Sequence, residues 1–221
     1  MTVIPFDSVL VPDNSACIRD CLHAGGIMAY PTDTLYGLGG NFLSPAAHAA
    51  VDRLKGRGGS PYSAAVADWA MLESLVAEIP DVFRGRLQDL LPGKFTFLFK
   101  PGPAVDPALL KGSGKIGIRM PGLPLLLELI SALGFPLIGT SANLSGRPPL
   151  NDPRRIAREF PGLDLLIDGG ALPPSRGSTV VDATGETPRI VRRGDDEEKA
   201  LSLLQGDGGR SSLTLGGKKL Q

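Results

Sequence analysis

The segment IMAYPTDTLYGLGGNF, residues 27–42, decides the fold that we expect for this chain. Its apolar run, residues 27–30, is closed by Pro31, which cannot donate to a sheet ladder, so the run predicts a short buried strand that ends abruptly. The polar residues 32–34 follow at once, with almost no apolar cover. Because ligands of open α/β sheets bind beyond the carboxyl ends of the strands, this polar segment predicts one wall of a ligand site.

Three glycines follow the polar residues, at positions 37, 39 and 40. Glycine allows the backbone either to approach another group closely or to turn with a positive φ. A simpler interpretation also stays open, in which the Thr-Asp-Thr segment and its glycines form only a turn.

A helix is expected directly after this segment, over residues 45–55. Ser44 is a good N-cap, Pro45 suits the first turn, and Gly56 ends the helix. The helix therefore places Lys55 and Arg57 at its exit. Both cations could face the same crevice as the polar strand end, although a lysine in a last turn often only opposes the helix dipole.

The composition indicates an ordinary globular chain of 221 residues, with 42% hydrophobic and 21% charged residues. We expect one domain over residues 1–205 and a flexible Gly- and Ser-rich tail over residues 206–221. Lys plus Arg equals Asp plus Glu at 23 each, so the whole chain is not a polycation for nucleic acid. Neither a secretory leader nor a membrane span is predicted, so we expect a cytoplasmic protein without membrane partners.

The cysteines and histidines argue against several kinds of site. Cys17 and Cys21 are four residues apart on a predicted helix, without the further ligands that a metal site needs or the spacing of a redox pair. His23 and His48 lie in predicted helices without a nearby nucleophile motif. We therefore expect no protein metal site and no histidine-based hydrolase.

Two later segments carry further polar groups at expected strand ends. In KIGIRMP, Arg119 lies near the end of a largely buried strand, so it needs either an internal carboxylate or an anionic ligand. In TSANLSGRP, Ser141, Asn143 and Ser145 follow a strand over residues 135–140 and are suited to gripping a phosphate. A turn with surface serines is the alternative.

The rest of the chain alternates helices and strands, which predicts one α/β domain around a mixed, twisted sheet. The last two strands are expected to be antiparallel. The other expected helices cover residues 15–24 with Asn14 as cap, 68–76, 80–91, 123–133, 152–160 and 195–205, and the other expected strands cover residues 62–67, 94–100, 163–170, 179–182 and 188–194.

Five motifs in this order, PTDTLYGLGG, KGR, IGIRMP, TSANLSG and GSTVVD, resemble the YrdC-like family. The resemblance covers residues 25–194. It implies a twisted, mixed open sheet flanked by helices, with a large cationic concave cavity. The characterised enzymes of the family are L-threonylcarbamoyladenylate synthases.

The resemblance implies a reaction of L-threonine, bicarbonate and ATP that gives threonylcarbamoyl-AMP and pyrophosphate, with Mg²⁺ accompanying the triphosphate. A second protein system would then transfer the threonylcarbamoyl group to tRNA. Such chemistry needs no protein nucleophile, because the carbamate oxygen attacks the α-phosphate. The protein must supply alignment and positive charge.

The resemblance also implies roles for individual residues. Threonine binding falls to Thr32, Thr34, Arg119 and Ser178, with Arg119 pairing the substrate carboxylate. Nucleotide binding falls to Lys55, Arg57, Ser141, Asn143, Asn151 and Arg192, of which Lys55 and Arg57 are the expected catalytic residues.

The chain departs from the family pattern at Ser60 and Lys94, where many members have Asn and Pro, and Ala65 lies near the position of a usual His. These changes resemble in part the YciO-like branch of the family. Two alternatives therefore stay open, an adenylating enzyme for another substrate and a non-catalytic protein that binds RNA or ribosomes. Lys94, Lys100, Lys111, Lys115, Arg147 and Arg176 could line an RNA-binding surface, and weak RNA binding is also expected of the enzyme.

Overall fold

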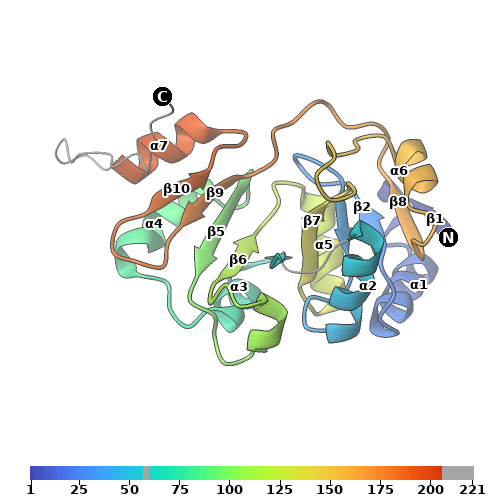
Figure 1. Ribbon diagram of the computed structural model, residues 1–221, viewed down its shortest axis with the longest axis horizontal. Helices are drawn as coiled ribbons and strands as arrows, with labels where there is room; N and C mark the ends of the chain where they lie inside the picture. The colour runs from blue at the N-terminus through green and yellow to red at the C-terminus, as the bar shows by residue number, and fades with distance from the viewer. Residues whose placement is uncertain (57–59, 206–221) are drawn as a thin grey trace.

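The computed structural model describes residues 1–56 and 60–205 of the chain. In this part, ten strands form one mixed sheet in the order β1-β8-β2-β3-β7-β4-β6-β5-β9-β10. Figure 1 shows β1 and β8 at one end of the curved sheet and β9 and β10 at the other, with α7 beyond them. Among residues 1–56 and 60–205, none of the helices has both the length and the hydrophobicity of a membrane span.

The elements agree in type and order with most of the expected pattern. The strands are β1 (Thr2–Pro5), β2 (Met28–Tyr30), β3 (Gly37–Gly39), β4 (Ser63–Ala65), β5 (Phe95–Phe99), β6 (Ile116–Arg119), β7 (Leu137–Ser141), β8 (Leu165–Asp168), β9 (Thr179–Asp182) and β10 (Arg189–Arg192). The helices are α1 (Pro12–His23), α2 (Pro45–Lys55), α3 (Trp69–Leu75), α4 (Asp81–Leu90), α5 (Pro124–Leu133), α6 (Pro153–Glu159) and α7 (Glu197–Gln205), with short 3-10 turns η1 (Phe6–Ser8) and η2 (Pro107–Leu110). As expected, β10 is antiparallel to β9.

Apolar clusters cover both faces of the first half of the sheet. Successive strand residues point to opposite faces, so Ala29 of β2 belongs to one cluster while Met28 and Tyr30 belong to the other. The second cluster is completed by α1 and α5, which contact each other. This half of the sheet is therefore a rigid support for the polar residues that follow β2.

The second half of the sheet is apolar on one face and open on the other. Phe95, Phe97 and Phe99 of β5 are buried in the core, as their alternation predicts. The residues between them, Thr96 and Leu98, line a cavity on the opposite face. The alternation of β5 thus supplies both a core face and a wall of the candidate site.

Helix α2 begins and ends as its sequence predicts. The Oγ of Ser44 accepts a hydrogen bond from the backbone N of Ala47 at 3.3 Å, and Gly56 takes a left-handed conformation with φ 69°. The prediction for α1 was wrong at its start, because the helix begins at Pro12 and Asn14 lies inside it. A proline fits the first helical turn well, and the side chain of Asn14 donates to Ser8 instead of capping.

Strand β3, with sequence Gly-Leu-Gly, was not predicted. Gly37 and Gly39 have no positive φ, so close approach, not turning, explains them. A Cβ atom on Gly39 would lie 2.5 Å from the carbonyl oxygen of Ile138 and 2.7 Å from the ring of Tyr30. Only glycine permits this contact, which brings β3 against β7.

Candidate functional site

One cavity of about 490 Å³ brings together most of the residues that the sequence analysis singled out. It lies between the segment after β2, the end of α2, the loop after β7 and the open face of β5, β6 and β9. Seven expected site residues line it: Thr32, Lys55, Arg119, Ser141, Asn143, Ser178 and Arg192. Segments that are far apart in the sequence therefore meet at one site.

The other three expected residues are placed differently. Thr34 is not in the cavity wall but contacts Arg119 through its hydroxyl. Asn151 is also absent from the wall, since its Nδ2 donates to the carbonyl oxygen of Pro173 at 3.1 Å. Its Oδ1 is shielded from solvent and has no hydrogen-bond partner among the described residues. Arg57 lies outside the described residues.

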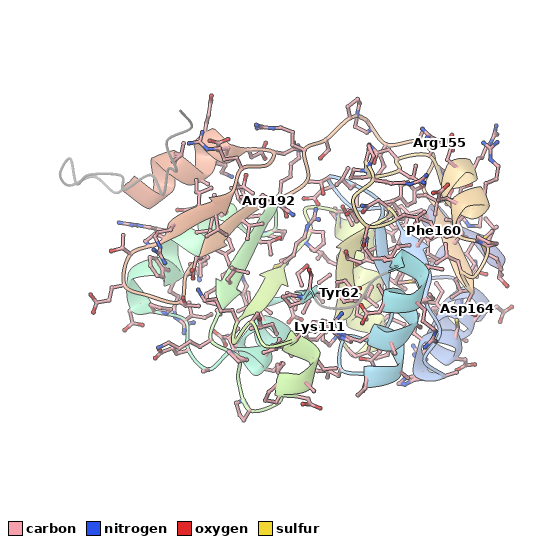
Figure 2. The ribbon with its side chains drawn as sticks, viewed as in Figure 1. Tyr62, Lys111, Arg155, Phe160, Asp164 and Arg192 are labelled. Carbon is pink, nitrogen blue, oxygen red and sulfur yellow. The ribbon has the colours of Figure 1, made fainter. Side chains whose placement is uncertain are left out.

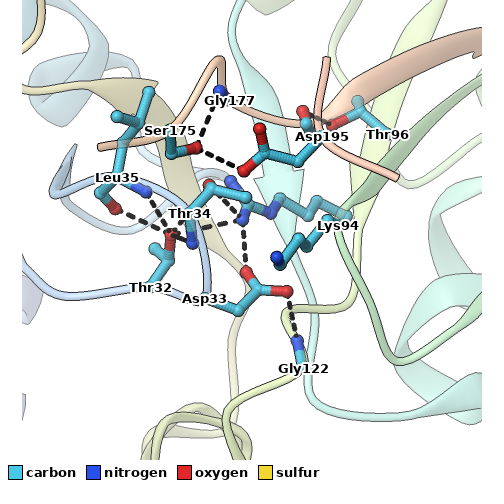
Figure 3. Close-up of polar contacts among 12 residues, drawn as sticks. Thr32, Asp33, Thr34, Leu35, Lys94, Thr96, Gly122, Ser175, Gly177 and Asp195 are labelled. Carbon is cyan, nitrogen blue, oxygen red and sulfur yellow. Dashed lines mark hydrogen bonds and ion pairs between the residues drawn. The ribbon is translucent and has the colours of Figure 1, made fainter. Parts of the chain in front are cut away.

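Arg119 is fixed by the Thr-Asp-Thr segment. Its Nη2 donates to Thr34 Oγ1 at 2.6 Å, to Thr32 Oγ1 at 3.2 Å and to Oδ1 of Asp33. The other oxygen of Asp33 accepts from the backbone N of Gly122 at 2.8 Å, as Figure 3 shows. In the described part of the chain, Nε of Arg119 has no hydrogen-bond partner and is shielded from solvent. The Thr-Asp-Thr segment therefore holds the guanidinium through its Nη2 atom.

Asp33 is a site residue that the sequence analysis did not assign. It was expected only that Arg119 needs an internal carboxylate or an anionic ligand, and the structure supplies the carboxylate. The side chains of Asp33 and Arg119 are only 8% and 14% exposed, so the pair is largely desolvated. No local signal in the sequence marked Asp33, because its partner Arg119 is 86 residues away in the chain.

Lys55 organises the loop that follows β7. Its ammonium group is buried and donates to the carbonyl oxygens of Ser141 at 2.6 Å and Asn143 at 2.9 Å, and to Asn143 Oδ1 at 3.2 Å. Ser141 Oγ also donates to Asn143 Oδ1, at 2.6 Å. This loop is therefore not a free surface turn, and Lys55 does more than oppose a helix dipole.

Another wall of the cavity, besides those around Arg119 and Lys55, is formed by Thr96, Ser178 and Arg192. Arg192 Nη2 donates to the carbonyl oxygen of Ser178 at 2.8 Å and to its Oγ at 3.0 Å. The hydroxyls of Ser178 and Thr96 are 2.8 Å apart. Burial, and then the positive charge of Arg119, hold the pKa of Arg192 below its usual value. The two guanidinium groups are therefore electrostatically coupled.

Asp195 holds the loop that carries Ser178. It accepts from Ser175 Oγ at 2.6 Å and from the backbone N of Arg176 at 3.0 Å, and Figure 3 shows Ser175 between Asp195 and Gly177. Burial would raise the pKa of this carboxyl, but these two hydrogen bonds, with Lys94 and Arg176 nearby, hold it below its usual value.

The segment over residues 60–65, which departs from the family pattern, contributes both an open space and an aromatic side chain to the cavity. Ala65 is paired with Arg119 across β4 and β6, so only a methyl group stands beside the arginine there. Tyr62 lines the cavity, and its hydroxyl donates to Asp52 at 2.5 Å. Lys111 contacts the same Asp52 oxygen at 2.5 Å and lies 4.4 Å from the ring centroid of Tyr62; Figure 2 labels both residues.

The described residues that line the cavity include five cations and no Asp or Glu. The cations are Lys55, Lys115, Arg119, Arg176 and Arg192. Carboxylates lie behind some of them, because Lys115 contacts Asp182 at 2.7 Å and Arg119 contacts Asp33. An arrangement of cations and hydroxyls around a hollow of this size suits an anionic ligand.

The comparisons with known proteins agree with this geometry. The family model Sua5_yciO_yrdC, described as "Telomere recombination", matches residues 20–194. The threonylcarbamoyl-AMP synthase of Dichelobacter nodosus is 33% identical over 171 residues, which cover 75% of this chain and 90% of the relative. The threonylcarbamoyl-AMP synthase of Bacillus subtilis is 31% identical over 188 residues, covering 84% of this chain and 54% of the relative.

Two solved structures share the fold. A crystal structure of P. abyssi Sua5 complexed with L-threonine is 30% identical with a TM-score of 0.79, covering 86% of this chain and 58% of that chain. The crystal structure of E. coli YciO is 29% identical with a TM-score of 0.74, covering 82% of this chain and 90% of that chain. This chain therefore spans little more than half of the Sua5 and Bacillus relatives but most of the others.

Proposed function

Because the chain belongs to the Sua5/YciO/YrdC family, we propose that it is a threonylcarbamoyl-AMP synthase. Its substrates are L-threonine, bicarbonate and ATP, and its products are threonylcarbamoyl-AMP and pyrophosphate. The observation that carries the proposal is that Arg119, Lys55 and Asn143 line one cavity. A reaction of three anionic or zwitterionic substrates without a protein nucleophile requires such convergence.

The amino acid is assigned to the wall around Arg119. Nη2 of this arginine is held by Asp33 and the two threonines, and Nε is shielded from solvent, so Nη1 remains for the carboxylate of L-threonine. Asp33 and Thr34 act as positioning residues, because they fix the guanidinium. Ala65 leaves room for the substrate side chain beside Arg119.

The triphosphate is assigned to the wall around Lys55, with Ser141 and Asn143. The Lys55 ammonium donates to three loop oxygens. Phosphate binding therefore requires that Lys55 give up one of these acceptors for a phosphate oxygen, or that the Nδ2 of Asn143 give up a carbonyl oxygen of the loop. The positive charge then stabilises the negative charge that develops as pyrophosphate leaves. Arg57 and Asn151 stay assigned to the nucleotide as predictions.

The reaction needs alignment more than acid–base chemistry. The neutral amine of threonine first attacks the carbon of bicarbonate, so that an N–C bond forms, a C–O bond breaks and water leaves. An oxygen of the resulting carbamate then attacks the α-phosphorus of ATP. The bond between the α-phosphorus and the bridging oxygen breaks, and pyrophosphate leaves. Holding the carbamate and the phosphate at a fixed distance is the contribution that we assign to the cavity walls.

Mg²⁺ is assigned to the nucleotide and not to a site made by the protein. The described residues contain no group of three or more His, Cys, Asp or Glu side chains that could hold a metal ion. A magnesium ion would therefore enter with the triphosphate, and the cations of the cavity would complement its charge. Downstream transfer of the threonylcarbamoyl group to tRNA is left to other proteins.

An RNA-binding protein without catalysis is favoured less, for a specific reason. Each of the six cations that could line an RNA surface has a carboxylate oxygen within 3.8 Å. The pairs are Lys94–Asp196, Lys100–Glu78, Lys111–Asp52, Lys115–Asp182, Arg147–Glu159 and Arg176–Glu197. Charge that is already paired attracts phosphate backbones less strongly.

Pyrophosphate release tests the proposal. Purified protein with ATP and Mg²⁺ is expected to release pyrophosphate only when L-threonine and bicarbonate are both present. Release that does not depend on L-threonine, or that another amino acid supports better, would reject threonine as the substrate.

A further inference from the structure

We infer that residues 111–115, the segment between η2 and β6, gate the cavity, and that Lys111, Asp52 and Tyr62 form the latch that holds this gate closed. The segment is called the strap, since two of its residues border the cavity. The inference rests on the proposed function, because the ligand that passes the gate is the nucleotide. It goes beyond that function, because it concerns the exchange of ligands and not the reaction.

The latch consists of three side chains from three segments of the chain. Nζ of Lys111 and the hydroxyl of Tyr62 both donate to Oδ1 of Asp52, each at 2.5 Å. Nζ of Lys111 also lies 4.4 Å from the ring centroid of Tyr62, and Figure 2 shows both residues between η2 and α2. The lysine and aspartate side chains are only 14% and 23% exposed, so salt screens their contact less than that of a surface ion pair.

The latch crosses the cavity at the end where β4 and β6 begin. Helix α2 packs on β3, whereas the strap leads directly into β6. In the sheet, β7 and β4 lie between these two strands. Gly139 of β7 and Ser63 of β4 line the cavity, as does Ser113 of the strap. The contact of Lys111 with Asp52 therefore joins the two sides of the cavity.

The middle of the strap is held by the latch and by little packing. Gly112 and Gly114 have φ values of 78° and 63°, and a Cβ atom on either would meet no atom of the described residues within 4 Å. Residues 112–114 are exposed. Lys111 itself has a φ of 49°, a left-handed conformation that is unfavourable for a residue with a Cβ atom. The contact with Asp52 therefore holds a backbone that would relax if the contact broke.

Both ends of the strap are fixed, so its motion is confined to a few residues. Leu110, directly before the strap, is buried in the core. After the strap, β6 pairs with β4 and with β5, and Lys115 donates to Asp182 at 2.7 Å. Opening of the gate is therefore a local change at residues 111–114 that leaves the sheet in place.

The latch lies closer to the phosphate wall than to the wall assigned to the amino acid. Asp52 and Lys55 are three residues apart on α2, so they are neighbours on one face of the helix. Arg119, in contrast, is the last residue of β6, and the strap precedes the first. A strand of that length separates them by about 10 Å. The strap should therefore control the exchange of the nucleotide more than that of L-threonine.

Stopped-flow kinetics with mant-ATP, which carries a fluorescent methylanthraniloyl group, tests the inference in the absence of L-threonine. Asp52→Asn removes the charge that Lys111 contacts, and Asp52 does not line the cavity. We expect the association and dissociation rate constants both to rise about fivefold, which matches the contribution of a partly buried ion pair with a cation–π contact. A lost ligand contact would raise only the dissociation rate constant.

Reversing the charges gives a second pair of variants. Lys111→Asp would place two carboxylates beside each other and should raise both rate constants further. Adding Asp52→Lys restores opposite charges and should return both rate constants towards those of the unaltered protein. Glu78→Gln is the matched control, since it breaks the ion pair with Lys100, whose side chains are 62% and 58% exposed and lie outside the cavity wall. Its rate constants should not change.

Trypsin gives an independent measurement, because it cleaves after lysine and the strap contains Lys111 and Lys115. Asp52→Asn keeps both lysines, so its strap should be cut faster than that of Glu78→Gln, and mass spectrometry identifies the cut. Urea unfolding of each variant shows that the compared rates belong to folded protein.

The outcomes separate this inference from the proposed function. If mant-ATP binds but Asp52→Asn raises only its dissociation rate constant, or neither rate constant, the gate is overturned and the synthase proposal stands. If the unaltered protein does not bind mant-ATP, the proposed function fails and trypsin alone decides on the strap. Faster cutting in Asp52→Asn then supports the latch, and equal cutting overturns it.

Discussion

The ammonium nitrogen of Lys55 lies 2.6 Å from the carbonyl oxygen of Ser141, which is 86 residues further along the chain. This contact joins the end of α2 to the loop after β7 and closes the cavity on one side. Lys55 is 4% exposed, and its ammonium group donates to loop oxygens inside the protein. The site is therefore held together by the same group that we assign to the phosphates.

Lys55→Met is expected to reduce both stability and turnover. The carbonyl oxygens of Ser141 and Asn143 would lose their donor, and an unsatisfied buried acceptor costs about 1–3 kcal/mol. Urea unfolding should show this loss, and turnover should fall more than the KM for L-threonine rises. Lys100→Met is the control, since Lys100 is 58% exposed and lies outside the cavity wall. Equal behaviour of the two variants would contradict the assignment.

Arg119→Gln is expected to affect L-threonine selectively. Losing one partner of a desolvated charge-assisted contact costs on the order of 2–5 kcal/mol, which is at least about thirtyfold in the KM for L-threonine. The KM for ATP should change little, because the phosphates are assigned to the Lys55 wall. Steady-state kinetics with each substrate varied in turn checks this. A larger rise in the KM for ATP would place the nucleotide, and not the amino acid, at Arg119.

Lys111→Met is expected to destabilise the fold more than Lys100→Met. The side chains of Lys111 and Asp52 are 14% and 23% exposed, and the lysine also lies over Tyr62, whereas those of Lys100 and Glu78 are 58% and 62% exposed. Exposed pairs contribute about 0–1 kcal/mol, but removing one member of a more buried pair leaves a charge without compensation. Urea unfolding of the two variants should give this order, and the reverse order would contradict it.

Stability is expected to fall between pH 7.5 and pH 5 because of His48. Burial holds the pKa of this histidine below 6.5, against the opposing effect of its bond to the carbonyl oxygen of Phe42 at 2.8 Å; Lys111 lowers the pKa further and Asp52 raises it. The unfolded chain then binds the proton more readily, so stability is present above about pH 6.5 and is lost as the pH falls below it.

His48→Gln should flatten this dependence, because the amide can donate to Phe42 but does not titrate. The carboxyls of Asp52, Asp182 and Asp195 have lowered pKa values, so their own losses come at lower pH. Urea unfolding at intervals from pH 7.5 to pH 5 measures the slope. An unchanged slope in His48→Gln would show that another group is responsible.

The sequence was sufficient where local signals decide the structure. Ser44 and Gly56 fix both ends of α2, and the alternation of Phe95, Phe97 and Phe99 fixes the faces of β5. Both signals are independent of the rest of the chain. In contrast, β3 is formed by Gly37 and Gly39, which have no side chains to give a periodic pattern, so only its contact with β7 makes it a strand.

Site residues were predicted from the sequence only where they belong to one of the motifs. Lys55 and Arg119 are the last residues of α2 and β6, Asn143 follows β7, and the fold places all three in one cavity. Asp33 and Thr96 were not assigned, because their roles depend on partners that are 86 and 82 residues away. A lone carboxylate or hydroxyl is typical of many turns and strands, so its partner cannot be inferred without the pairing of the sheet.

Isotope transfer into the product tests the central claim most directly, namely that the amino acid, bicarbonate and the nucleotide meet in one cavity. The protein is incubated with ¹⁵N-threonine, ¹³C-bicarbonate and ATP, and the masses of the products are measured by mass spectrometry. We predict one adduct of AMP that carries both labels. AMP or pyrophosphate formed without a doubly labelled adduct would contradict the account.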